Sequence, residues 1–311
     1  MLYNINKTTK GIERGAHMET PITAIGFSEI DKAYTLKELV EEVVEKPTQQ
    51  QIGTSNKRDI IAEYIKNVDK DVNVIVRVVA RAGVDNDSSN IEIEQCEPYL
   101  EASQTLDVED LAVEEVEDEY NYYVIAEDSD TGIQFIFWLQ NAIEYLEAKK
   151  ENKELKKVAI AALATEGTIV LPVQQDDDDE KMLTEEKEKI KSMIKKAREG
   201  DEDAIKQLES EEEEMDQQLK ERMYEEDFLT IMSGYFIPTT LEDANYAILG
   251  EIKEIKERKN ELTGEEMYLF NLNVNDMPLE VMINKNELVG YPTVGMRFMG
   301  TAWLQGTIVI E

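Results

Sequence analysis

The chain has 311 residues, 41% of them hydrophobic, and a formal net charge of −35. This length and composition predict two domains with their own cores and an insertion, and exclude a disordered protein. The negative charge repels nucleic acid and anionic lipid, and the sequence contains no apolar run long enough to span a membrane and no signal peptide, so we expect a cytoplasmic protein.

The first segment, residues 1–20, is predicted to be a flexible leader. Within it, Gly15-Ala16-His17-Met18 resembles the remnant of an expression tag before a native start at Met18. His17 is the only histidine of the chain. Histidine-dependent triads and histidine-ligated metal sites are therefore excluded.

Residues 21–175 are predicted to form a mixed sheet-and-helix domain of the α+β class. Apolar residues at helical spacing predict helices over 36–44, ended by Pro47, and over about 58–68; a third is expected from about 141 to 150. Alternating patterns predict strands at 72–78, 91–94, 106–116, 122–126, 133–139, 158–163 and 168–171. Glu166-Gly167 is expected to be a tight turn between the last two strands.

Cys96 is the only cysteine, so it has no partner for an internal disulfide, in agreement with a reducing compartment. It follows the alternating residues 91–94. We expect a half-buried strand residue rather than a nucleophile, because no nearby basic group would lower its pKa.

Residues 176–238 are predicted to be an acidic helical hairpin followed by a linker. Residues 176–227 contain 22 acidic and 10 basic residues, and their apolar residues recur at helical spacing. The hairpin should bend at Gly200-Asp201, where Asp201 or its neighbour would cap the second helix. A calcium site at Asp176–Asp179 is disfavoured because four consecutive carboxylates lack the spacing and turn glycine of an EF-hand loop. Residues 235–238 are expected to be an apolar linker that packs the two halves together.

Residues 239–311 are predicted to form a five-stranded OB-like β-barrel. The strands are expected at 247–256, 266–274, 279–283, 297–304 and 307–310, with a hairpin turn at Asn275-Asp276 and a helical turn or loop at 284–288. Four aromatic residues could stack on single-stranded nucleic acid, but alternation makes most of them core residues and acidic side chains crowd the same strands. These residues are Tyr268, Phe270, Phe298 and Trp303. We therefore expect a scaffold or a protein-binding module.

One short sequence occurs in both predicted domains. Gly167-Thr168-Ile169-Val170 and Gly306-Thr307-Ile308-Val309 are identical tetrads. A match this short does not by itself indicate a duplication.

Several segments from residue 24 onward carry a resemblance to a known family. They are Ala24-Ile25-Gly26-Phe27-Ser28, Ile136-Phe137-Trp138-Leu139-Gln140-Asn141, Ala164-Thr165-Glu166-Gly167-Thr168-Ile169, Gly200-Asp201-Glu202-Asp203-Ala204-Ile205, Tyr246-Ala247-Ile248-Leu249-Gly250-Glu251-Ile252, Ile283-Asn284-Lys285 and Trp303-Leu304-Gln305-Gly306. Together they resemble an uncharacterised family of anaerobic Gram-positive bacteria, the domain of unknown function numbered three-eight-eight-one in its series. The resemblance implies an intracellular bacterial protein and transfers no activity and no catalytic residue.

Three functions are compatible with these observations. The favoured one is a non-enzymatic cytoplasmic protein that binds or regulates another protein, because histidine chemistry and a phosphate-binding glycine loop are missing. We assign no catalytic, cofactor-binding or metal-binding residue, and expect no cofactor. The alternative is a carboxylate-dependent, metal-assisted hydrolase; Glu166 and Glu251, each beside a glycine at a strand end, are the carboxylates to inspect. An acidic mimic of nucleic acid is less favoured, because lysines interleave with the acids over 181–198.

Overall fold

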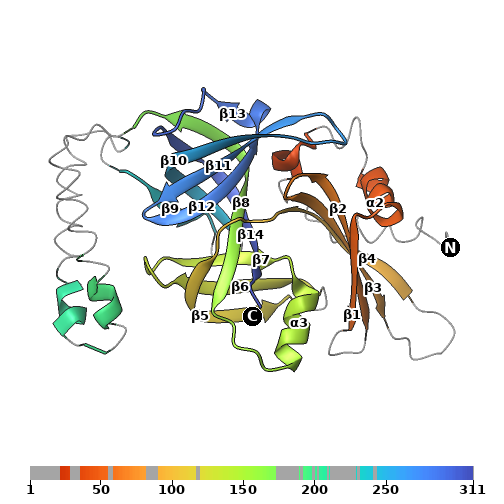
Figure 1. The fold of residues 1–311 in the computed structure, drawn as a ribbon, viewed down its shortest axis with the longest axis horizontal. Helices are drawn as coiled ribbons and strands as arrows, with labels where there is room; N and C mark the ends of the chain where they lie inside the picture. Colours follow the sequence, from red (N-terminus) through yellow and green to blue (C-terminus); the bar gives the residue numbers. More distant parts are fainter. Residues whose placement is uncertain are drawn as a thin grey trace.

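Figure 1 shows the computed structural model of the chain, which describes residues 22–28, 36–54, 59–81, 90–116, 120–172, 232–240 and 244–310, with shorter stretches between 189 and 229. The predicted leader with His17 and most of the acidic segment lie outside the described residues. The described fold is mostly β with few helices, and its strands form two sheets. The expected α+β class was too rich in helix, since the segment predicted as a helix over about 58–68 is a strand.

The smaller sheet consists of four antiparallel strands in the order β1 (Gln49–Thr54), β2 (Ile60–Asp69), β3 (Val72–Arg81) and β4 (Asn90–Leu100). Helix α2 (Leu36–Glu45) packs on one face, against β2 and β3 (Figure 1). It buries Leu39, Val40 and Val43, the stripe that its spacing predicts, and ends before Pro47.

The helix predicted over 58–68 is wrong, because this segment is strand β2. Ile61, Ile65 and Val68 fit a helical stripe, but β2 is flanked on both sides by hydrogen-bonded strands, β1 and β3. Tertiary pairing therefore decides the state of a segment whose β-branched residues suit a strand equally well.

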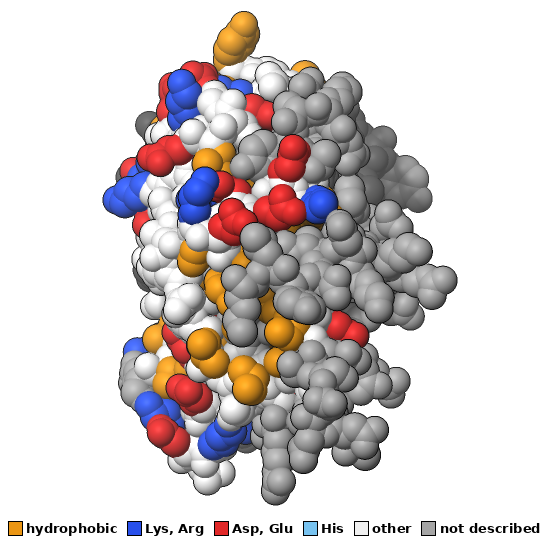
Figure 2. Space-filling model, turned by 90° about the vertical axis from the view of Figure 1, so that its right-hand side faces the viewer, with side chains coloured by type: hydrophobic (Ala, Val, Ile, Leu, Met, Phe, Trp, Pro, Cys, Tyr) orange, Lys and Arg blue, Asp and Glu red, His pale blue; other side chains and the backbone are white. Residues whose placement is uncertain are grey.

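The side of this sheet that carries α2 is only partly covered. Ile52, Ile60 and Ile91 are exposed there, and the pairing of the strands places them on one face. Figure 2 looks onto this side of the molecule and shows hydrophobic side chains gathered in its lower half, with acidic and basic side chains intermixed above.

The remaining elements belong to the larger sheet or lie against it. They are η1 (Ile22–Ile25), β5 (Leu106–Glu115), β6 (Tyr122–Asp128), β7 (Gln134–Leu139), α3 (Ala142–Lys150), β8 (Lys157–Val170), β9 (Tyr235–Pro238), β10 (Asn245–Lys259), β11 (Glu266–Val274), β12 (Met277–Asn284), η2 (Lys285–Glu287), β13 (Leu288–Val289) and β14 (Arg297–Ile308). The predicted helix at 141–150, the strand at 266–274 and the hairpin turn at Asn275-Asp276 are confirmed. The linker predicted at 235–238 is wrong, because these residues are β9, paired with β10.

The strand pairings of the larger sheet close two rings that share β8 and β14. One ring runs β10, β11, β12, β8, β14 and back to β10. The other runs β5, β6, β7, β14, β8 and back to β5. The ring built around the C-terminal strands therefore takes its fifth strand from β8, earlier in the chain. The separate strand predicted at 307–310 is wrong, because residues 307 and 308 continue β14 and residues 309 and 310 lie beyond its end.

The two rings have the same plan. In each, a three-strand meander is followed by a helix and a long strand, which is β8 after the first meander and β14 after the second. The third strand of each meander runs parallel to the long strand that follows the other meander, β7 to β14 and β12 to β8. A step of 145 residues carries the pair Tyr123↔Trp138 of β6 and β7 onto Tyr268↔Ile283 of β11 and β12.

The identical tetrads occupy matching places in this plan. The step of 139 residues that carries Gly167 to Gly306 also carries Leu163 to Ala302 and Ala164 to Trp303, and these four central residues pair with one another as Ala164↔Ala302 and Leu163↔Trp303. The two tetrads therefore begin at corresponding positions of β8 and β14.

Both glycines of the tetrads lie inside continuous strands, so the turn predicted at Glu166-Gly167 is wrong. A Cβ on Gly167 would lie 2.4 Å from Cε2 of Phe298, and one on Gly306 would lie 2.3 Å from the carbonyl oxygen of Ala159. Glycine is required here for close approach of neighbouring groups rather than for a change of chain direction.

The residues singled out as core or structural lie largely as expected. Phe270, Phe298 and Trp303 are buried, whereas Tyr268 is half-buried and stacks on Phe270. Cys96 is half-buried on β4, and burial, together with the charge of Glu97, raises the pKa of its thiol to about 12. In the acidic segment, Asp201 Oδ1 accepts hydrogen bonds from the N–H groups of Asp203 and Ala204, the capping role expected at this position.

Candidate functional site

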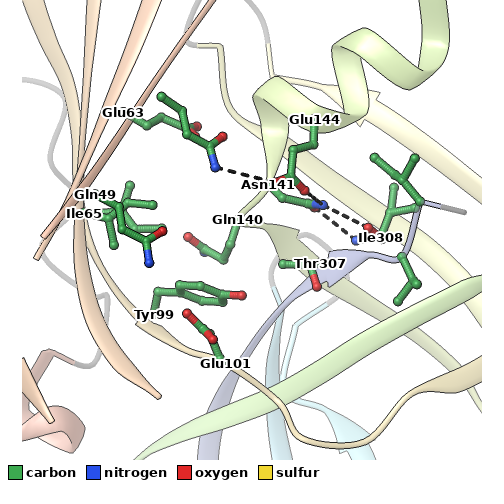
Figure 3. A pocket seen from close by; sticks show the side chains of 14 residues that line it. Gln49, Glu63, Ile65, Tyr99, Glu101, Gln140, Asn141, Glu144, Thr307 and Ile308 are labelled. Carbon is green, nitrogen blue, oxygen red and sulfur yellow. Dashed lines mark hydrogen bonds between the residues drawn. The ribbon is translucent and has the colours of Figure 1, made fainter. Parts of the chain in front are cut away.

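A cleft of ≈ 340 Å³ lies between the two sheets (Figure 3). Strands β1 to β4 form one wall, and the start of α3 with the end of β14 forms the other. The lining residues are Gln49, Gln51, Glu63, Ile65, Ile75, Tyr99, Glu101, Gln140, Asn141, Glu144, Thr307, Ile308, Val309 and Ile310. Most of them carry hydrogen-bonding groups, so the cleft is predominantly polar.

The polar wall follows from alternation along β3 and β4. In β3, the valines at 72, 74 and 76 point to one side, and Asn73, Ile75 and Arg77 point to the other. The pairing places Arg77 between Glu63 and Gln95, on the face opposite α2. One face of the small sheet is therefore apolar beneath α2, and the other presents polar groups to the rings.

Arg77 fixes the small sheet to the larger one. Its side chain is 1% exposed, and its Nε and Nη2 lie 2.9 and 2.8 Å from Glu63 Oε1. Its Nη1 donates to the carbonyl oxygen of Tyr120 and to Asn121 Oδ1, each at 3.1 Å, and the Tyr120 hydroxyl in turn bonds to Asp59. Through this buried network, Glu63, which lines the cleft, is tied by Arg77 to the residues just before β6.

Two carboxyl groups near the cleft have a raised pKa. Burial raises the pKa of Glu63 against the lowering effect of Arg77. Burial also raises the pKa of Glu97, whose carboxylate accepts hydrogen bonds from Gln95 and Gln140. A raised pKa in a concavity is a feature of acid–base groups in enzymes and also of buried structural networks.

Tyr99 lies at the centre of the lining. Burial raises the pKa of its hydroxyl, the charges of Glu101 and Glu144 raise it further, and a hydrogen bond with Thr307 opposes them. Asn73 Nδ2 donates to Glu101 Oε1 at 3.1 Å, and Asn141 Nδ2 donates to Glu144 Oε2 at 2.9 Å. Each carboxylate is thus oriented by an amide group, and the negative charges of both act on the hydroxyl of Tyr99.

The carboxylates inspected for a hydrolase lie elsewhere. Glu166 is exposed and accepts a hydrogen bond from Thr301 at 3.4 Å, and Glu251 pairs with Lys253 at 2.7 Å. Neither lines the cleft. Within the described ranges, no three His, Cys, Asp or Glu side chains are grouped so that they could hold a metal ion.

The sequence analysis assigned none of the cleft residues to a functional site. Alternation in β3 and β4 does place Asn73, Arg77 and Tyr99 on one polar face, and this was the available signal. Gln140 and Asn141 carry no such signal, because they follow a buried strand and depend on where β14 ends.

Comparisons with known proteins give one match. The family model described as "Domain of unknown function, E. rectale Gene description (DUF3881)" matches residues 22–306. No curated protein and no solved structure matches the chain. In the part of the chain that is described, the helices are too short or too polar to cross a bilayer.

Proposed function

We propose that the chain, which belongs to the DUF3881 family, a domain of unknown function, is a non-enzymatic, cytoplasmic protein that binds another protein. The observation that carries this proposal is the cleft itself, a concavity of ≈ 340 Å³ that is lined mainly by residues with polar side chains. This volume lies at the lower end of the range for ligand sites and suits one long side chain of a partner.

The composition of the lining favours binding over catalysis. Among the described residues that line the cleft, none is a serine, cysteine, histidine or lysine. Its hydroxyl groups, on Tyr99 and Thr307, bond to each other. The cleft therefore offers recognition groups, and it lacks a nucleophile beside a base.

The two-ring body supports this function as a scaffold. We propose that the ring of β10, β11, β12, β8 and β14 is an OB-like barrel whose fifth strand comes from earlier in the chain. The net charge of −35 makes nucleic acid and membranes unfavourable partners, so a protein surface is the proposed one.

A carboxylate enzyme is the second candidate, favoured by the raised pKa values of Glu63 and Glu97. Against it, Glu63 is engaged by Arg77 at 2.8 Å, an arrangement that serves structure.

A photo-crosslinking residue placed in β1 tests the binding function. At Gln51 it would face the cleft, and at Ile52, which is 66% exposed, it would face the opposite side of the same strand. We expect native extract to yield a partner crosslinked from position 51 and not from position 52. Equal crosslinking from both positions, or none from position 51, would contradict the proposal.

A further inference from the structure

One end of the ring formed by β10, β11, β12, β8 and β14 carries exposed apolar side chains. Here β13 pairs with the end of β8 on one side and β14 pairs with it on the other, so the loop 290–296 between them passes over the end of β8. Four residues at this end are each more than half exposed, and the tyrosine is 91% exposed: Leu171, Val289, Tyr291 and Val294. We call them the ring-end patch. Single apolar residues scattered over a surface are ordinary, whereas a group at one place indicates an interaction site.

The loop that carries the patch is tied to β10 through its backbone. The N–H of Gly295 donates to the carbonyl oxygen of Ile252 at 2.9 Å, and the N–H of Ile252 donates to the carbonyl oxygen of Met296 at 2.8 Å. Gly290 and Gly295 have φ of 99° and 88°, a conformation that favours glycine. The exposed side chains are therefore presented by a defined loop of the ring.

The matching end of the other ring is covered. There, α3 follows the first meander and passes beside the end of β14, as η2 and β13 follow the second meander and pass beside the end of β8. Helix α3 packs on β1 of the small sheet, and Lys150 Nζ donates to the carbonyl oxygen of Thr54 at 2.9 Å. Figure 1 shows α3 at the lower edge beside the small sheet and β13 at the upper edge, where none of the described elements lies outside it. The same plan is thus covered at one end and open at the other.

Arg297 fixes both points where the acidic segment meets the ring. Only 4% of this residue is exposed. Its Nε donates to the carbonyl oxygen of Leu171 at 2.8 Å, its Nη1 to that of Met232 at 2.6 Å and its Nη2 to that of Leu229 at 2.8 Å. Because Leu171 belongs to the patch, the acidic segment leaves the ring at the patch and returns beside it.

The charge near the patch is therefore negative. Residues 176–227 contain 22 acidic and 10 basic residues, and both ends of this stretch are tethered to the ring end. Asp176 follows Leu171 by five residues, which span at most about 18 Å of chain. Glu287, directly before β13, is exposed. A surface that approaches the patch meets this charge, so a cationic one is favoured.

From the apolar patch and the negative charge beside it, we propose that the ring end binds a partner protein through an apolar surface bordered by lysine and arginine. Apolar side chains supply the buried contact, and opposite charges around it steer the approach and reject other partners. A second copy of the chain is disfavoured because it brings the same charge of −35, and that charge also disfavours an anionic membrane. The patch is separate from the cleft, so this binding goes beyond the function proposed above and does not depend on it.

The test titrates three synthetic peptides into the full chain labelled with ¹⁵N. The first is an amphipathic helix with leucine on one face and lysine on the other; the second has glutamate in place of lysine, and the third has serine in place of leucine. We expect the leucine–lysine peptide to shift the backbone signals of Val289, Tyr291 and Val294, and the other two to bind at least tenfold more weakly. Equal binding of the leucine–glutamate peptide would overturn the basic border, and equal binding of the serine–lysine peptide would overturn the apolar contact.

Two matched variants separate the patch from a general attraction of cations to an acidic protein. Val289→Ser should weaken binding of the leucine–lysine peptide by about tenfold, whereas Ile52→Ser should leave it unchanged. The two side chains are 67% and 66% exposed, so neither change opens a core, and Ile52 lies on the small sheet. Equal losses in both variants, or no loss in Val289→Ser, would overturn the proposal.

Two further measurements test the other occupants of the patch. We expect Tyr291→Ser to change neither the sedimentation of the chain alone nor its flotation with phosphatidylcholine vesicles. A dimer that Tyr291→Ser dissociates would show that a second copy covers the patch, and flotation that Tyr291→Ser abolishes would assign the patch to a membrane surface. Either result would overturn the proposal. Crosslinking from position 51 reports on the cleft alone, so its outcome distinguishes failure of the function proposed there from failure of the ring-end patch.

Discussion

Asn141 and Ile308 exchange two hydrogen bonds, one in each direction. Asn141 Nδ2 donates to the carbonyl oxygen of Ile308 at 2.9 Å, and the Ile308 N–H donates to Asn141 Oδ1 at 3.1 Å. The amide thus continues the pairing of β7 with β14 beyond its last backbone pair, Gly306↔Leu139. This use explains why Asn141, at the N-cap position of α3, makes no side-chain capping bond. The same Nδ2 donates to Glu144, so one amide joins the start of α3 and the end of β14, the two elements that form one wall of the cleft.

Replacing Asn141 by alanine should free the end of β14. We expect a loss of about 1–2 kcal/mol in the free energy of unfolding, because two hydrogen bonds disappear at a partly buried position. The backbone amide of Ile308 should exchange with solvent faster. Urea denaturation and amide hydrogen exchange measure these effects, with Gln134→Ala on the exposed side of β7 as the control. Unchanged protection of Ile308 would show that Asn141 does not hold the strand.

Replacing Arg77 by methionine should be far more costly. The change leaves the carboxylate of Glu63, which is 2% exposed, without its cation, and breaking a buried pair in this way costs about 3–5 kcal/mol. Equilibrium denaturation measures the loss. The control is Arg81→Met on the same strand, because Arg81 is 36% exposed and pairs with Glu92 and Glu94 at the surface, so we expect a loss below about 1 kcal/mol.

The double variant Glu63→Gln with Arg77→Met separates pairing from packing. Because it removes the stranded charge, we expect it to be more stable than Arg77→Met alone. A double variant that is less stable than either single one would show that the contacts of Arg77 with Tyr120 and Asn121, rather than its pairing with Glu63, carry the stabilisation.

Glu97→Gln should change how stability depends on pH. Burial raises the pKa of Glu97 above its ordinary value of 4.5, so the folded state binds this proton more tightly than the unfolded state. The stability linked to the proton is complete below pH 4.5 and is lost as the pH rises through the folded pKa. We therefore expect Glu97→Gln to be more stable than the parent at pH 8 and to lose that advantage towards pH 4. Thermal denaturation across this range measures the difference, with Glu147→Gln as the exposed control; a constant difference at all pH values would contradict the prediction.

Local patterns predicted the elements whose signals are local. The stripe of α2 is bounded by Pro47, and β11 is delimited by the turn Asn275-Asp276, in which both residues have positive φ. The segment at 60–69 failed because its helical spacing and its β-branched residues point to different states, and only pairing with β1 and β3 decides between them.

The long-range arrangement could not be predicted in the same way. β8 joins the C-terminal strands through parallel pairing with β12, which leaves no mark on either sequence segment. The cleft depends on this arrangement, because Gln140 and Thr307 meet the small sheet only once β7 and β14 end side by side. The alternation of residues in β3 indicated its polar face, but no sequence pattern indicated the opposite wall of the cleft, which the start of α3 and the end of β14 form.

The two tetrad glycines provide the sharpest test of this arrangement. The sequence pattern predicts that a strand ends at each of them, whereas in the structure each lies inside a long strand. A methyl group on Gly306 would meet the backbone oxygen of Ala159 at 2.3 Å, and a methyl group on Gly167 would meet the side chains of Phe298 and Ile283 at 2.4 and 2.9 Å. An aromatic ring can shift more easily than a paired backbone carbonyl. Gly306→Ala should therefore lower the free energy of unfolding by about 2–3 kcal/mol, and Gly167→Ala should lower it by about 1–2 kcal/mol. Urea denaturation measures both, with Thr165→Ala, an exposed position of β8, as the control. If Gly306→Ala were as stable as the parent, β14 would not pass beside Ala159 as one strand, and a turn near residue 306 would again be the better description.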